Sequence, residues 1–134
     1  MDCVAGMREL PDESVDCVVT DCPYEISHHG STAMGGILGQ NNPNALSGKV
    51  FEYNDIQFDE YLPELYCVLK PDTHCYIMIN SRNLKDLQMA AEKAGFKFQN
   101  LLVWRKNSST PNKFYMQQLE FILMLRKGRK PLPI

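Results

Sequence analysis

The order of apolar and polar positions along the chain predicts helices alternating with strands. In three segments, residues 3–10, 58–69 and 84–94, apolar side chains recur every three or four positions, as in a helix that lays one face on a core. Apolar runs of strand length predict strands at 15–20, 74–79, 96–104 and 119–125. The run at 74–79 is nearly unbroken, which favours a strand covered on both faces.

Two segments lack periodicity and predict loops. Residues 25–54 are rich in glycine, asparagine and serine, and residues 107–113 are rich in serine, asparagine and proline. A loop as long as the first is usually functional or mobile in a compact domain.

This order of elements predicts an α/β fold, with a parallel core and a last strand that returns antiparallel as a hairpin partner. The 134 residues are enough for one domain with its own core, so we interpret residues 1–134 as a single domain. Periodicity alone does not indicate a function.

Composition narrows the class of protein. Apolar residues make up 44% and charged residues 22% of the chain, and no run is long enough to cross a bilayer. With no leader pattern at Met1, we expect a soluble cytoplasmic protein. The five cysteines form no Cys-x-x-Cys pair and His28 and His29 lie beside none of them, so we expect reduced thiols and no metal site.

Charge is divided between the two halves. Residues 1–72 carry 13 acidic and 3 basic side chains, whereas residues 73–134 carry 3 acidic and 11 basic ones, for a net charge of −2. The basic half ends in the run Arg126-Lys127-Gly128-Arg129-Lys130 and could face phosphates, and a solvated surface with a basic tail explains the charge equally well.

The clearest chemical signal is Asp21-Cys22-Pro23-Tyr24, which follows the predicted strand 15–20 directly. In α/β folds, the carboxyl ends of strands carry the chemistry. A carboxylate accepts hydrogen bonds, a proline stiffens the backbone, and a tyrosine ring offers a face for stacking. Together these groups suit the exocyclic amino group of a planar base.

This tetrapeptide resembles the Asp-Pro-Pro-Tyr motif of amino-group DNA methyltransferases, which make N6-methyladenine or N4-methylcytosine from S-adenosyl-L-methionine. Here Cys22 replaces the first proline. The resemblance spans nearly the whole chain, and the matching stretches look like those of phage and prophage members of the family. It is carried further by Asp2-Cys3, residues 10–16, 68–72, 104–106 and 120–123, and Arg126-Lys127-Gly128.

The resemblance implies a three-layer Rossmann-like methyltransferase sheet, of which this chain supplies the catalytic half, with mostly parallel strands that end in an antiparallel pair. The implied catalytic residues are Asp21, Cys22, Pro23 and Tyr24, and the implied cofactor-binding residues are Asp2, Cys3 and Asp21. Asp21 and the carbonyl of Cys22 would accept hydrogen bonds from the amino group. Tyr24 would stack on a base rotated out of the duplex.

Double-stranded DNA is the implied substrate, within a restriction-modification context. Candidate DNA contacts are His28, His29, Lys106, Lys113, Arg126, Arg129 and Lys130. For two other residues we expect structural roles, Trp104 in the core and Glu120 as a polar partner at the start of a strand.

Relatives with this motif order place a glycine-rich cofactor loop and a target-recognition region beyond the segment that ends near Gly128. We therefore expect a partial catalytic domain, in which strand 15–20 has a bare apolar edge that a second copy or another chain would cover. A catalytically inactive prophage remnant that binds DNA or a partner remains the alternative. Methylation of RNA or of a glutamine amide usually involves a motif that opens with Asn, so Asp21 disfavours it.

Overall fold

The computed structural model describes residues 2–23, 56–110 and 117–129. The chain divides into two compact units, one of residues 1–22 with 57–134 and one of residues 23–56. All the helices and strands described below belong to the first unit, and only Pro23 and Ile56 of the second are described.

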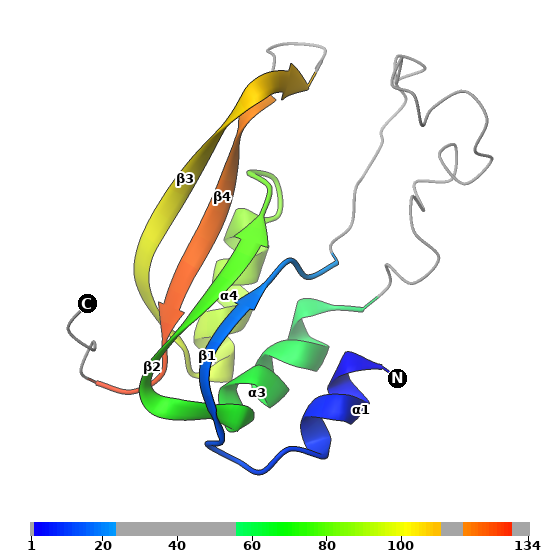
Figure 1. Ribbon diagram of the computed structural model, residues 1–134, viewed down its shortest axis with the longest axis vertical. Helices are drawn as coiled ribbons and strands as arrows, with labels where there is room; N and C mark the ends of the chain where they lie inside the picture. Colours follow the sequence, from blue (N-terminus) through cyan, green and yellow to red (C-terminus); the bar gives the residue numbers. More distant parts are fainter. Residues whose placement is uncertain (1, 24–55, 111–116, 130–134) are drawn as a thin grey trace. The chain divides into compact units, whose positions relative to one another are not determined.

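Helices and strands alternate in the predicted order (Figure 1). They are α1 (Cys3–Arg8), β1 (Val15–Thr20), α3 (Phe58–Val68), β2 (Leu69–Ile79), α4 (Leu84–Ala94), β3 (Lys97–Thr110) and β4 (Gln117–Arg126). Each predicted helix and strand is therefore confirmed, although β2, β3 and β4 are longer than predicted and α1 is two residues shorter.

The strands form one sheet in the order β1-β2-β4-β3. β1 and β2 are parallel, and β4 lies between β2 and β3, antiparallel to both. The α/β class and the closing antiparallel hairpin are thus confirmed. Parallel pairing is limited to β1 and β2 among the strands of the described ranges.

The helices pack on one face of this sheet (Figure 1). On that face, Cys75 pairs with Leu125 and Ile77 with Leu123, and all four side chains are fully buried. The alternate residues of β2 point to the other face, where Met78 is 36% exposed. The prediction that strand 74–79 is covered on both faces is therefore wrong.

The β3–β4 hairpin corrects two more predictions. β3 continues to Thr110 through residues predicted to begin a loop, because Thr110 still pairs with Gln117 after a shift in register. Trp104, expected in the core, is 56% exposed. It pairs with Glu120, whose carboxylate lies 2.7 Å from the Lys106 ammonium, so Glu120 has the polar partner expected of it, although it lies inside β4 and not at the start of the strand.

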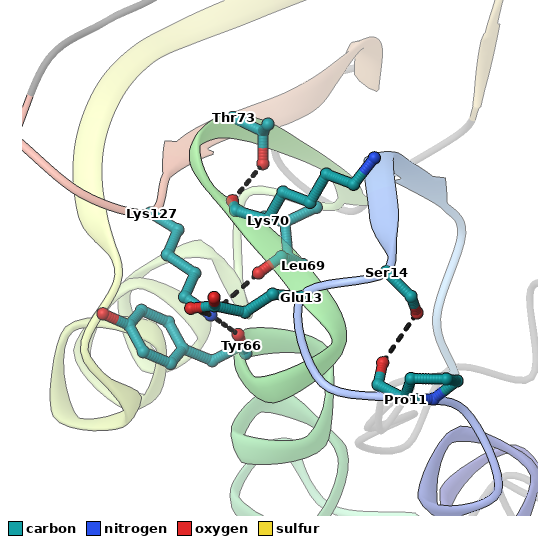
Figure 2. Close-up of polar contacts among 8 residues, drawn as sticks. All are labelled: Pro11, Glu13, Ser14, Tyr66, Leu69, Lys70, Thr73 and Lys127. Atoms are coloured by element: carbon teal, nitrogen blue, oxygen red, sulfur yellow. Dashed lines mark hydrogen bonds and ion pairs between the residues drawn. The ribbon is translucent and has the colours of Figure 1, made fainter.

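Lys127 joins three segments at the opposite end of the sheet (Figure 2). Its side chain is almost fully buried, and its Nζ donates hydrogen bonds of 2.8 Å to the carbonyls of Tyr66 and Leu69 at the end of α3. The same ammonium lies 3.4 Å from the Glu13 carboxylate and 4.8 Å from the centre of the Tyr66 ring. Helix ends leave carbonyls without intrahelical donors, and Lys127 supplies donors here.

Within the described ranges, no helix is long and apolar enough to cross a membrane.

The buried ammonium predicts the effect of Lys127→Met. The substitution leaves two carbonyls without a donor and Glu13 without its cation, so we expect the free energy of unfolding to fall by about 2–4 kcal/mol. Urea denaturation measures the change. Lys93→Met is the matched control, because Lys93 forms an exposed pair with Asp59 at 3.5 Å and should change stability by less than about 0.5 kcal/mol. Equal effects in the two variants would contradict a stabilising role for Lys127.

Candidate active site

Asp21 and Cys22 continue the backbone of β1 beyond its carboxyl end. Along β1, Thr20 is in register with the buried Ile77 and faces the helices, whereas Val19 faces the other way and is 66% exposed. Continued alternation would place Asp21 on the side of Val19 and Cys22 on the side of Thr20. The burial agrees, because Asp21 is exposed and Cys22 is half-buried.

The Asp21 carboxylate remains accessible. It forms no hydrogen bond or ion pair with any other described residue, so both oxygens can accept hydrogen bonds from a ligand. The nearby acid Asp16 differs, because its carboxylate lies 2.6 Å from the Lys70 ammonium. Asp16, on β1, is therefore paired with a cation, whereas the carboxylate of Asp21, just beyond the end of β1, is open to a ligand.

Cys22 is close to polar and thiol side chains that are wholly or partly buried, those of Thr20, Tyr61 and Cys75. Its Sγ is 3.4 Å from the Thr20 hydroxyl. Burial raises the pKa of the Tyr61 hydroxyl, and the nearby Cys22 and Cys75 raise it further. Burial also raises the pKa of the Cys75 thiol to about 12, with smaller contributions from Cys22 and Cys17. All these effects favour neutral side chains beneath the Asp21-Cys22 backbone.

Sequence reasoning missed Tyr61. Its position in the apolar repeat of α3 assigned it to the core, and its side chain is indeed only 2% exposed. Its hydroxyl, however, is buried without a hydrogen bond of standard geometry to a described residue, although the Cys22 thiol is close enough to oppose its ionisation. No sequence signal could have found this, because residues 22 and 61 meet only in the folded chain.

The two acidic segments implied to form the site lie near each other. Asp2 is the N-cap of α1, and its Oδ1 accepts a 3.3 Å hydrogen bond from the Val4 amide. The pKa of the Cys3 thiol is raised by burial first, and then by Asp2 and Cys22. The start of α1 is thus within electrostatic reach of Cys22, across a long separation in sequence.

The candidate DNA contacts separate into two groups. Lys106 and its partner Glu120 lie toward the end of the sheet at which β1 ends, although β3 is at the opposite edge of the sheet from β1. Arg126 pairs with His74, three strand positions or about 10 Å before Ile77, the partner of Thr20. The described basic candidates, Lys106, Arg126 and Arg129, therefore do not form one surface around the motif.

At that opposite end, Arg126 and Arg129 have structural contacts. The Arg126 guanidinium donates a 2.8 Å hydrogen bond to the Gly128 carbonyl, and the Arg129 amide donates to the Asp72 carboxylate at 3.1 Å. Their contact with DNA stays a prediction that this placement does not favour.

Several sequence-based candidates lie outside the described residues. These are Tyr24, His28, His29, Lys113 and Lys130. In the described ranges, no group of three or more His, Cys, Asp or Glu side chains could hold a metal ion.

Comparison with protein families gives a match over most of the chain. Residues 15–133 match the model of the DNA methylase family of N6 and N4 methyltransferases. The chain is 27% identical over 128 residues to the type II methyltransferase M2.LlaDCHI of Lactococcus lactis subsp. cremoris, covering 92% of this chain and 48% of that protein. It is 24% identical over 136 residues to M2.MboI of Moraxella bovis, covering 96% and 48% respectively. The chain thus spans about half the length of the curated relatives it matches.

Two solved structures have a similar fold. The modification methylase TTHA0409 of Thermus thermophilus, in complex with S-adenosyl-L-methionine, superposes with a TM-score of 0.63 at 22% identity, covering 99% of this chain and 54% of that one. The PvuII DNA methyltransferase, which is cytosine-N4-specific, gives a TM-score of 0.63 at 15% identity, covering 98% and 49%. At these identities the similarity shows the fold.

The buried thiol beneath the motif predicts a loss of stability in alkali. The pKa of Cys75 rises from 9.0 to about 12 on folding, so its contribution is complete below pH 9 and is lost as pH rises toward 12. In that window the unfolded chain releases the proton and the folded chain keeps it, so stability falls by up to about 1.4 kcal/mol per pH unit. Urea unfolding between pH 8 and 11 should show a shallower slope for Cys75→Ala than for the unsubstituted chain.

Cys67→Ala is the control for this measurement, because Cys67 is an exposed free thiol in the same fold. It should leave the pH slope unchanged. Identical slopes for Cys75→Ala and the unsubstituted chain would show that the Cys75 thiol does not couple folding to protons.

Proposed function

The chain belongs to the DNA methylase family of N6 and N4 methyltransferases, and we propose that it methylates the exocyclic amino group of adenine (N6) or cytosine (N4) in DNA. S-adenosyl-L-methionine would be the methyl donor. The observation that carries the proposal is the position of two acceptors where β1 ends. The carboxylate of Asp21 is exposed and forms no ion pair with another described residue, and the carbonyl of Cys22 follows it directly.

These two acceptors suit the chemistry of the amino group. The lone pair of an exocyclic amine is delocalised into the base, which makes the nitrogen a poor nucleophile. Hydrogen bonds from its two N–H groups to Asp21 and to the Cys22 carbonyl would localise the pair on nitrogen and aim it at the methyl group. Positioning and electrostatics would then supply the rate, with no covalent intermediate on the protein.

The target base must leave the duplex to reach these acceptors, which costs a few kcal/mol. Tyr24 would offset part of this cost by stacking on the extruded base, and Pro23 would limit the movement of that ring. Both follow Cys22 directly in the sequence, so the acceptors and the stacking ring are part of one short segment.

The residues near α1 fit the cofactor. Asp2 is exposed and uses one carboxylate oxygen for the helix cap, which leaves the other free to accept hydrogen bonds from hydroxyl groups such as those of a ribose. Asp2 also places negative charge near Cys3, which suits a positively charged sulfonium. When bound, the cofactor supplies the methyl group, while Asp2, Cys3 and Asp21 would hold it beside the acceptors.

For DNA contacts we favour the end of the sheet that carries Lys106, since β1 also ends there, although β3 and β1 are the two opposite edge strands. We also propose Lys113, His28 and His29 as DNA contacts, from their positions in the sequence alone, because they lie outside the described residues.

A second copy or another chain along the exposed edge of β1 would complete the site. Light scattering at high protein concentration tests that arrangement.

The proposal predicts a specific effect of Asp21→Asn. The amide keeps the shape but replaces one acceptor by a donor, so we expect methyl transfer to fall by about 10²-fold or more. Transfer of a radiolabelled methyl group to unmethylated duplex DNA measures the rate, and digestion to nucleosides identifies the product as N6-methyladenine or N4-methylcytosine. Calorimetric titration with S-adenosyl-L-methionine reports whether cofactor binding persists.

Asp16→Asn is the matched control, because Asp16 lies on the same strand but is paired with Lys70 on the surface. It should retain activity within about twofold. Equal activity of Asp21→Asn and the unsubstituted chain would contradict the role of Asp21. Absence of both cofactor binding and methyl transfer in the unsubstituted chain would favour the alternative, a non-catalytic protein that binds DNA or a partner.

A further inference from the structure

Cys22 restricts its own backbone less than a proline would. A proline at this position would fix the backbone angle φ near −65° and so hold its own carbonyl in place. A cysteine leaves φ free, yet the carbonyl of residue 22 is one of the two acceptors in the proposed reaction. Some other contact must hold the backbone there if the acceptor pair is to be rigid.

The side chain of Cys22 has such contacts. Its Sγ lies 3.4 Å from the Thr20 hydroxyl, within the range of a hydrogen bond that involves sulfur. The strand fixes Thr20, because Thr20 is in register with the fully buried Ile77 of β2. The thiol is therefore tied to the last residue of the sheet ladder rather than to a loop.

A buried polar group close to the thiol, the Tyr61 hydroxyl, lacks a hydrogen-bond partner in standard geometry among the described residues. The Tyr61 side chain is only 2% exposed, and its hydroxyl has no hydrogen bond of standard geometry to a described residue. An isolated buried hydroxyl costs free energy, so such groups normally have a partner. Burial raises the pKa of this hydroxyl first, and the charge of Cys22 and a side-chain hydrogen bond with Cys22 raise it further, so the two groups are close together.

We propose that the Cys22 thiol, held between the hydroxyls of Thr20 and Tyr61, replaces the proline ring as the feature that fixes the backbone of residue 22. Thr20 and Tyr61 are then positioning residues that act through Cys22. The role of the carbonyl rests on the proposed function, whereas the anchoring of the backbone does not. A hydrophobic side chain of similar size would fill the space without supplying the anchor.

A double-mutant cycle tests the anchor without any assay of activity. Thr20→Val and Tyr61→Phe should each lower stability in the Cys22 chain and have little effect in the Cys22→Ala background, with a coupling of about tenfold in the unfolding equilibrium constant. Thr73→Val is the matched control, because the Thr73 hydroxyl donates to the Lys70 carbonyl near the other end of β2. Its effect should add to that of Cys22→Ala.

Amide hydrogen exchange of Asp21 tests whether the backbone itself is held. Thr20→Val should accelerate exchange about tenfold in the Cys22 chain and should not accelerate it in Cys22→Pro, in which the ring replaces the anchor. If Cys22→Pro does not fold, Cys22→Ala takes its place, and there exchange should be fast with or without Thr20→Val. Additive stabilities for both pairs, or exchange unaffected by Thr20→Val, would overturn the proposal.

Methyl transfer separates this inference from the proposed function. Thr20→Val should lower kcat about tenfold with little change in KM for DNA, and the loss should be absent in the Cys22→Pro background. Equal losses in both backgrounds would overturn the positioning role. If no variant transfers methyl groups, the proposed function fails, and the stability cycle and hydrogen exchange still decide whether Thr20 and Tyr61 hold Cys22.

Discussion

The buried ammonium of Lys127 is the constraint on which the rest of the fold depends. A lysine so deeply buried must have its charge and donors satisfied, and here the carbonyls of Tyr66 and Leu69 and the carboxylate of Glu13 satisfy them. These groups belong to the end of α3, the start of β2 and the turn before β1. The last strand of the sheet is therefore joined at one point to the segments that set the position of the first two strands.

The consequence reaches the other end of β1. Backbone hydrogen bonds from Glu13 to Cys67 and from Ser14 to Val68 fix where β1 begins, and after a shift in register between Val15 and Cys17 the parallel ladder with β2 continues to Thr20. Asp21 and Cys22 follow immediately. The groups that stabilise the sheet thus lie at the amino end of β1, and the groups proposed for chemistry lie at its carboxyl end. This separation lets the carboxylate of Asp21 remain exposed and open to a ligand without loss of the sheet.

The sequence predicted what local patterns determine and missed what depends on contacts between distant segments. The three-and-four repeat located α4 at residues 84–94, and the tetrapeptide located Asp21 at the end of a strand. Trp104 was wrongly assigned to the core, because an apolar run does not reveal that the hairpin extends beyond the helices. Lys127 belongs to a basic run that indicated a solvated or DNA-facing segment, and only the fold shows that it is buried. The hydroxyl of Tyr61 was missed for the same reason.

The geometry of residue 22 also bears on why a thiol is tolerable at such a site. Alternation along the extended backbone places the side chain of Cys22 on the helix side of the sheet with Thr20, while Asp21 lies on the exposed side with Val19. A thiol facing an electrophilic methyl donor would risk alkylation, and the thiolate is the nucleophilic form. A thiol that faces Thr20 and the buried Tyr61 is turned away from the exposed carboxylate. The same orientation that anchors the backbone would therefore also keep the sulfur out of the reaction.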